Sequence, residues 1–235
     1  VSEIVSVAHD KNIPVMLDAA QSAGHVKINL KKMGADMLAF SGHKMCGPFI
    51  GALVCKKEIL KRLSPLIFGG GMVEETTTKS YKIKDDYKGF EAGLQDCASI
   101  LGLETACKYL EKIGFKRIEN YENKLTKRLT KGLSNFQEVS FIGVAEPKNK
   151  IAIVNFVLKG TSSMDVAMLL DELGGIAVRS GMHCAHSWYK KYSLPPSVRA
   201  SLYFYNTTEE VDIFLEKIEQ ITKIKKGKDI SRTRR

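Results

Sequence analysis

Two short apolar runs that end in polar residues limit most strongly what the first part of this chain can fold into. Residues 15–17 run into Asp18, and residues 37–40 run into Ser41. Apolar residues at helical spacing precede the first run, and residues 12–14, which end in proline, close that predicted helix. Helices that alternate with buried strands are typical of α/β domains, in which ligands bind at the carboxyl ends of the strands. The sequence therefore predicts a partial α/β domain with a ligand site beside Asp18 and Ser41.

The rest of the chain shows a change of pattern near residue 112. Residues 1–112 continue the α/β pattern, residues 113–224 suit a smaller α+β domain, and residues 225–235 form a basic tail. Thr207 and Glu210 have the spacing of a capping box that opens a final helix. The other predicted strands lie at 51–55, 139–142, 151–158, 176–178 and 198–205, and the other predicted helices lie at 56–63, 95–110, 115–133 and 163–173.

Cysteine count and charge exclude several classes of protein. Five cysteines without a C-x-x-C pair argue against a disulfide framework and favour a reducing compartment such as the cytoplasm. Residues 223–235 contain seven Lys/Arg and one Asp, so the net charge of +10 is largely that of a tail. We expect this tail to be solvated and disordered, and we expect no specific nucleic-acid partner. No apolar run approaches the roughly 20 residues of a membrane helix. Because Val1 lies inside a predicted helix, we expect the chain to be part of a longer protein.

A histidine and a lysine, His43 and Lys44, follow the second apolar run directly after a Ser-Gly turn. The amine of Lys44 can attack a carbonyl carbon, as attachment of an aldehyde cofactor requires. Asp18 can pair with a pyridine nitrogen, so the two residues meet the needs of pyridoxal phosphate if their strands are close in the sheet. Gln21 can then bond the phenolic oxygen of the ring, and Ser41 a phosphate oxygen. Taken alone, the tripeptide ending in Lys44 also fits a surface loop, and Asp18 also fits a helix N-cap.

A second candidate group surrounds Cys184. A cysteine becomes a nucleophile when neighbouring cations favour its thiolate, and Arg179 and His183 are both close in sequence. One alternative is a buried, inert cysteine. A zinc site that includes His186 is disfavoured, because adjacent residues rarely converge on one tetrahedral ion and no second ligand pair exists.

A third candidate is Arg199, on the polar face of the alternating run 198–205. A planar guanidinium suits bidentate recognition of a carboxylate. The alternative is an exposed arginine on a sheet.

In combination, these motifs resemble the SufS-type (group II) cysteine desulfurases, which are class V enzymes of fold type I that depend on pyridoxal phosphate. The resemblance runs from Val1 to about Ile224. The motifs that carry it are Leu17-Asp18-x-x-Gln21, Ser41-Gly42-His43-Lys44, Phe90-Glu91-Ala92-Gly93, Arg179-Ser180-Gly181-x-His183-Cys184 and Arg199-Ala200-Ser201.

The resemblance implies that residues 1–112 are the C-terminal part of a large cofactor-binding domain with a mostly parallel sheet. It implies that residues 113–224 form a small α+β domain with the sulfur-accepting cysteine. For the cofactor, the resemblance implies that Lys44 carries it, that Asp18 pairs with its ring nitrogen and that Gln21 bonds its phenolic oxygen. Ser41 and His43 would bind its phosphate. For the substrate, the resemblance implies that Cys184 accepts the sulfur, with His183 and Arg179 beside it, and that Arg199 holds the carboxylate.

The implied reaction converts L-cysteine to L-alanine. Lys44 takes the Cα proton, Cys184 attacks the substrate sulfur, and the resulting persulfide is passed to an acceptor protein that serves iron–sulfur assembly or thiolation. The family also implies a homodimer. Two positions depart from it: Leu94 stands where a threonine is usual, and Met182 where a second histidine is frequent.

Three other functions remain open from the sequence. A selenocysteine lyase uses nearly the same residues. A truncated, inactive module for dimerisation or acceptor binding needs no chemistry. An aminotransferase is less favoured, because its reaction does not require Cys184.

Overall fold

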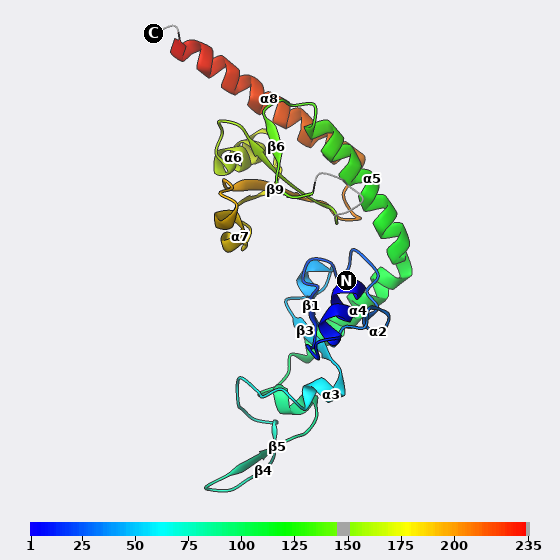
Figure 1. Ribbon diagram of the computed structural model, residues 1–235. Coiled ribbons are helices and arrows are strands. Elements are labelled where there is room, and N and C mark those ends of the chain that lie inside the picture. The colour runs from blue at the N-terminus through cyan, green and yellow to red at the C-terminus, as the bar shows by residue number, and fades with distance from the viewer. Residues whose placement is uncertain (145–150, 234–235) are drawn as a thin grey trace. The chain divides into compact units, whose positions relative to one another are not determined.

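The computed structural model describes residues 1–144 and 151–233 (Figure 1). The chain divides into two compact units, Val1–Phe115 and Lys116–Arg235, hereafter unit 1 and unit 2. The sequence analysis placed a division near residue 112. No helix in the described part of the chain combines the length and the apolar character needed to cross a membrane.

Unit 1 contains a three-stranded sheet in the order β1-β2-β3. β1 (Met16–Asp18) and β2 (Met37–Ser41) are parallel, and β3 (Gly51–Cys55) is antiparallel to β2. The hairpin formed by β4 and β5 was not predicted from the sequence. The remaining elements of unit 1 are α1 (Ser2–His9), α2 (Leu30–Met33), η1 (Gly42–Lys44), α3 (Lys57–Leu60), β4 (Val73–Thr76), β5 (Tyr81–Ile83), η2 (Tyr87–Phe90) and α4 (Cys97–Ile113).

A buried carboxylate joins the segments that carry β1, β2 and β3. Asp36, just before β2, accepts a hydrogen bond of 2.7 Å from the backbone N–H of Val15 and one of 2.8 Å from Lys56 Nζ. His9 Nε2 lies 2.8 Å from the same carboxylate. The hydrogen bonds from Lys56, His9 and Val15, in that order of size, hold the pKa of Asp36 well below its usual range. This cluster therefore fixes the start of the two parallel strands.

Unit 2 contains a four-stranded antiparallel sheet in the order β6-β7-β9-β8. Helices α5, α6 and α8 accompany this sheet in unit 2 (Figure 1). Their side chains form one core with those of β7 and β9. The elements of unit 2 are β6 (Val139–Phe141), β7 (Ile153–Leu158), α6 (Ser163–Gly174), β8 (Arg179–Gly181), α7 (His186–Lys191), β9 (Ser197–Ser201) and α8 (Thr208–Thr233), together with α5 (Phe115–Leu133), whose first residue belongs to unit 1.

The two faces of this sheet differ because strand side chains alternate. Val154, Phe156, Val198 and Ala200 point into the helix-covered core and are buried. Arg199 has the opposite parity in β9, and the register pairs it with Asn155 of β7. The predicted candidate Arg199 therefore lies on the sheet face away from the core.

Two predicted strands differ from the structure. Residues 176–178 do not form a strand; the paired strand β8 begins one residue later, at Arg179. The reason is the left-handed Gly175 that ends α6, after which the Ile176 N–H still bonds Leu170 O instead of a neighbouring strand. β9 also ends at Ser201, well before residue 205, because the Tyr203 N–H turns to the side chain of Asn206.

Two helix predictions were wrong in extent, and the predicted cap is confirmed. α3 is shorter than the predicted 56–63, because after Leu60 the N–H groups of Arg62 and Leu63 bond the carbonyl oxygens three residues back, of Ile59 and Leu60, instead of continuing the α-helical pattern. α8 continues through residues 225–233, where a disordered tail was expected, and residues 234–235 lie outside the described residues. The Thr207 hydroxyl accepts from the Glu210 N–H at 3.2 Å, and the Glu210 carboxylate accepts from the Thr207 N–H at 2.9 Å, which is a capping box.

Candidate active site

The polar residues that end β1 and β2 lie at the same edge of the unit 1 sheet. The parallel register pairs Asp18 with Ala39, so Asp18 stands two residues before the position of Ser41. Asp18 is exposed at this edge and accepts a hydrogen bond of 2.9 Å from the Ala20 N–H. The one-turn helix η1 follows Ser41 directly and carries Lys44. The condition set by the sequence, that the strands of Asp18 and Lys44 be neighbours, is therefore met.

The turn that carries Lys44 is closed by two glycines. The Gly42 N–H donates to Ile50 O at 2.7 Å, and the Gly47 N–H donates to Gly42 O at 2.9 Å. A Cβ on Gly42 would lie 2.8 Å from Pro48 O, and a Cβ on Gly47 would lie 3.0 Å from Gly42 O. Only glycine fits this close backbone approach, which fixes the direction in which Lys44 leaves the strand.

Gly42→Ala is expected to open this turn and to destabilise unit 1 by about 1–3 kcal/mol, because the new methyl group meets the rigid backbone oxygen of Pro48. Hydrogen exchange at the amides of Met45 and Gly47, which both bond Gly42 O, measures the opening. The matched control is Gly51→Ala, whose Cβ lies an ordinary 3.6 Å from Phe40 O. Equal protection of these two amides in both variants would contradict the prediction.

The other predicted residues of this edge lie on the surface. Gln21 is exposed in the turn after β1. The exposed His43 ring stacks on Phe49, with ring centroids 5.1 Å apart and an interplanar angle of 20°. An amine, a carboxylate, an amide, a hydroxyl and an imidazole therefore lie on the segments that follow two adjacent strands. This donor set can hold an aromatic aldehyde that also bears an anionic group.

Cys184 in unit 2 is exposed and has a cationic neighbour. Arg179 Nη2 donates a hydrogen bond of 3.2 Å to Cys184 Sγ. The segment between β8 and α7 that carries the thiol has an unusual backbone, since φ is +53° at His183 and +63° at Cys184. Non-glycine residues rarely adopt this left-handed conformation, which tends to occur at functional sites. The predicted pairing of Arg179 with Cys184 is thus present in the structure.

His183 does not supply the second cation that the sequence analysis expected. Burial, followed by the positive charges of Arg199 and Arg179, lowers the pKa of His183 below its ordinary value of about 6.5, so its neutral form is favoured. Its Nε2 lies 2.9 Å from Ser197 Oγ, and the hydroxyl of Tyr189 lies 2.7 Å from the same oxygen. The imidazole therefore belongs to a partly buried polar network, and Arg179 is the cation that contacts Cys184.

Two arginines and an asparagine form a row across the same sheet. The register places Arg179 of β8 directly opposite Arg199 of β9, and Arg199 opposite Asn155 of β7. Like charges in opposite positions repel, and burial, followed by Arg179, lowers the pKa of Arg199. Arg199 Nε and Asn155 Oδ1 are both buried without a hydrogen-bond partner in the structure. The two guanidinium groups suit an anion, and a carboxylate is the natural bidentate partner of a guanidinium, whereas Asn155 Oδ1 is an acceptor that needs a donor.

Sequence reasoning missed Asn155, Ser197 and Tyr189. Asn155 gave a signal, since it is the one polar residue inside the apolar run of β7. Ser197 and Tyr189 gave none, because only the pairing of β8 with β9 brings them to His183. The structure thus gathers Arg179, His183, Cys184 and Arg199 in unit 2 and the remaining predicted residues in unit 1.

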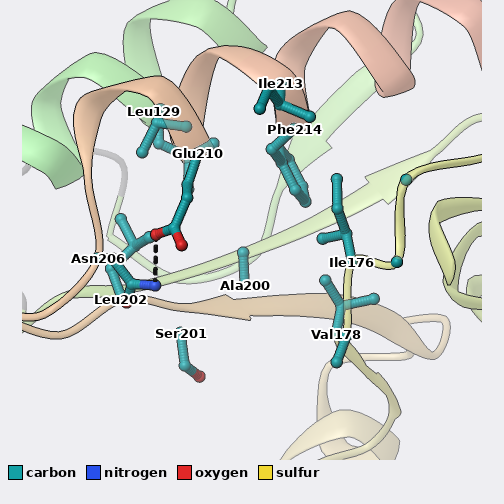
Figure 2. Close-up of a pocket in the computed structure, with 14 residues that line it drawn as sticks. Leu129, Ile176, Val178, Ala200, Ser201, Leu202, Asn206, Glu210, Ile213 and Phe214 are labelled. Carbon is teal, nitrogen blue, oxygen red and sulfur yellow. Dashed lines mark hydrogen bonds between the residues drawn. The ribbon is translucent and has the colours of Figure 1, made fainter.

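A separate cavity of about 330 Å³ lies in unit 2 between α8, β9 and the segment after α6 (Figure 2). Its lining exposes about as much polar as apolar surface, and side chains such as Ile176, Val178 and Phe214 form the apolar part. Its carboxylate, Glu210, is already engaged by Asn206 and by the capping box. None of the predicted site residues lines this cavity, so it is not a candidate for the reaction.

Comparisons with known proteins assign the family. The family described as Aminotransferase class-V matches residues 1–214. A probable cysteine desulfurase of Methanothermobacter thermautotrophicus is 38% identical over 226 residues, which cover 94% of this chain and 56% of that protein. One of Pyrococcus abyssi is 39% identical over 227 residues, covering 95% and 56% of the two chains.

A solved structure gives the same result. The apo structure of a cysteine desulfurase from Thermococcus onnurineus matches with a TM-score of 0.90 and 41% identity, over 95% of this chain and 56% of that one. The chain therefore has the fold of these enzymes and spans about half the length of the relatives it matches. With a family match over residues 1–214, this chain belongs to the class-V aminotransferase family.

Proposed function

We propose that this chain forms part of a cysteine desulfurase that depends on pyridoxal phosphate and converts L-cysteine to L-alanine, leaving a persulfide on Cys184. The observation that carries the proposal is the exposed Cys184 thiol, 3.2 Å from Arg179 Nη2, in a unit that also presents Arg199. A transaminase has no use for such a thiol. The relatives named as cysteine desulfurases support the same activity, although the chain spans about half their length.

Members of the class-V family depend on pyridoxal phosphate, and the edge of the unit 1 sheet fits this group. The aldehyde carbon and the nitrogen of its ring lie on opposite sides of the ring, so an amine and a carboxylate must reach it from different strands. Lys44 and Asp18 follow adjacent parallel strands and meet this need. Gln21 is proposed to bond the phenolic oxygen, and Ser41 and His43 the phosphate.

When bound, pyridoxal phosphate supplies an electron-accepting ring that makes the Cα proton of an amino acid removable. The Asp18 carboxylate would pair with the ring nitrogen and favour its protonated form. Lys44 Nζ would hold the group through its aldehyde carbon and, as a free amine, would take up the Cα proton of the substrate. Arg199 holds the substrate carboxylate.

The sulfur-transfer step uses the thiol of unit 2. The Cys184 thiolate, held by Arg179, attacks the sulfur of the substrate. The C–S bond of L-cysteine breaks as the new S–S bond forms. The electron pair of the broken bond stays with Cβ, which gains a proton equivalent to the one lost by the Cys184 thiol, and the proton taken by Lys44 returns to Cα. The products are therefore L-alanine and a persulfide on Cys184.

We further propose that the protein is of the SufS type, in which the persulfide passes to a dedicated sulfur-acceptor protein for iron–sulfur cluster or thiolation pathways. The short distance along the chain between Cys184 and the start of α7 at His186 supports this assignment. A thiol on so short a segment has little reach of its own and needs an acceptor that comes to it.

We also propose that the protein works as a homodimer in the cytoplasm. Exposed large apolar side chains at Leu66, Ile67, Phe68 and Leu94 in unit 1 are the kind of surface that a partner subunit covers. All five cysteines are free, which suits a reducing compartment.

Borohydride reduction after incubation with pyridoxal phosphate, followed by peptide mass mapping, tests the cofactor assignment. We expect a label at Lys44 and at no other lysine, since Lys44 alone follows a strand adjacent to that of Asp18. The label is to be sought on this chain and on a protein as long as its relatives. Absence of label at Lys44 in both would refute the dependence on pyridoxal phosphate.

Product analysis separates the remaining candidates. A desulfurase forms alanine from L-cysteine with sulfide release under reducing conditions. A selenocysteine lyase acts on selenocysteine in preference, and an inactive module forms no alanine from either. Comparison of sulfide and selenide release under identical conditions decides among the three.

A further inference from the structure

The backbone around Cys184 is strained, and something must hold it. His183 and Cys184 are consecutive non-glycine residues with positive φ. Each such conformation is energetically unfavourable for a non-glycine residue and persists only where its surroundings fix it. Within this segment the Ala185 N–H bonds Met182 O at 2.8 Å, which closes the turn but does not anchor it to the sheet.

The anchor is a chain of three polar side chains. Ser197 is fully buried at the start of β9, opposite Gly181 of β8. Its hydroxyl oxygen lies 2.7 Å from the hydroxyl of the buried Tyr189 and 2.9 Å from His183 Nε2. The rings of His183 and Tyr189 also meet edge to face, with centroids 6.1 Å apart. The chain of contacts thus runs from α7 through β9 to the residue next to the thiol.

We propose that Ser197 and Tyr189 are positioning residues, which lock the His183 imidazole and thereby hold the Cys184 thiol within hydrogen-bond distance of Arg179. The inference rests on the proposed function in one respect: it takes Cys184 to be the sulfur acceptor. It assigns a role to two residues that contact neither the thiol nor any proposed ligand.

The hydrogen bond between His183 and Ser197 has a definite direction. His183 Nδ1 is buried without a hydrogen-bond partner in the structure. An N–H group that is buried without a partner is costlier than a nitrogen lone pair that is buried without one, so the proton of the neutral ring belongs on Nε2. His183 Nε2–H therefore donates to Ser197 Oγ, and the same oxygen shares a hydrogen bond with the Tyr189 hydroxyl, in which either oxygen can be the donor. These contacts hold the ring in one orientation.

The position of the thiol decides its reactivity. Arg179 starts from β8, the neighbour of the strand that begins with Ser197, so both ends of the Arg179–Cys184 contact are anchored on one sheet. If the segment relaxes to ordinary negative φ, Cys184 moves relative to Arg179 and the thiolate loses its closest cation. A thiol without that cation is ionised to a smaller extent at neutral pH.

The test is the pH profile of Cys184 alkylation by iodoacetamide, followed on the Cys184 peptide by mass spectrometry. In Ser197→Ala we expect alkylation at neutral pH to slow about ten-fold relative to alkylation at alkaline pH. The rate at alkaline pH, where every thiol is ionised, should match that of the unchanged chain. Tyr189→Phe, which removes a single hydroxyl, should move the profile in the same direction.

The double variant Ser197→Ala/Tyr189→Phe should shift the profile no further than Ser197→Ala alone, because both changes break one network. Ser201→Ala is the matched control: it removes a hydroxyl from the same face of β9 at an exposed position and should leave the profile unchanged. A purely structural role would lower the melting temperature of Ser197→Ala without moving the pH profile, and that result would overturn the proposal.

The outcome is separate from that of the proposed function. The alkylation assay needs neither cofactor nor substrate. If the profile of Ser197→Ala is shifted but the protein forms no alanine, the positioning role is supported and the desulfurase activity is refuted. If the protein forms alanine but the profiles of Ser197→Ala and the unchanged chain coincide, the desulfurase activity is supported and the positioning role is refuted.

Discussion

Replacing Cys184 by alanine is expected to abolish alanine formation from L-cysteine, with a loss on the order of a thousand-fold or more in kcat. The reason is chemical: in the proposed reaction the C–S bond of the substrate breaks as its sulfur is taken by the Cys184 thiolate, and an alanine side chain at position 184 has no thiol. Arg179 is then left without its thiol partner. The measurement is the initial rate of alanine release by a protein as long as the relatives of this chain.

The same variant should still accept the cofactor. Cys184 belongs to unit 2, whereas Lys44 and Asp18 belong to unit 1, so borohydride labelling of Lys44 is expected to be unchanged. Cys97→Ala is the matched control, because it removes another exposed cysteine at the first turn of α4. Full activity in Cys184→Ala would contradict the proposed sulfur acceptor, and loss of the label would show that the change had damaged unit 1.

Those features of the site that depend on neighbouring residues in the sequence were predictable. Asp18 and Lys44 each follow an apolar run, and the carboxyl ends of two parallel neighbours must lie at one edge of the sheet. The contact between Arg179 and Cys184 spans five positions, which one turn can bridge. In both cases local pattern and chain connectivity together leave few arrangements.

Features that depend on strand pairing were not predictable. Ser197 lies just outside the predicted strand 198–205, and its contact with His183 follows only from the antiparallel register of β8 with β9. That register also buries His183 and sets Arg199 opposite Arg179, which favours the neutral imidazole where the sequence suggested a cation. The apolar residues 176–178 likewise read as a strand, but the left-handed Gly175 sends them past the edge of the sheet.

The stability of unit 1 should depend on the ionised form of Asp36. Its pKa is held below the ordinary value of about 3.9 by Lys56, His9 and the Val15 N–H. A carboxyl whose folded pKa is lowered adds stability at every pH above its unfolded value and loses that stability as pH falls toward the folded one. We therefore expect the stability of unit 1 to be level down to about pH 5 and to fall below about pH 4.

Asp36→Ala is expected to destabilise unit 1 by about 2–4 kcal/mol at neutral pH, because it removes a buried carboxylate and leaves the half-buried Lys56 amine, the exposed His9 ring and the Val15 N–H without their acceptor. Hydrogen exchange in peptides from β1 and β2 measures the effect, since the single tryptophan, Trp188, reports on unit 2 alone. Glu104→Gln is the matched control: it removes one negative charge of unit 1 at an exposed ion pair with Lys108 and should change the protection of these peptides little.

The acid dependence gives a second readout. In Asp36→Ala, protection of β1 and β2 should not decrease further below about pH 4, because the carboxyl group that titrates there is gone. An acid-induced loss in β1 and β2 that is the same with and without Asp36 would show that another carboxyl is responsible.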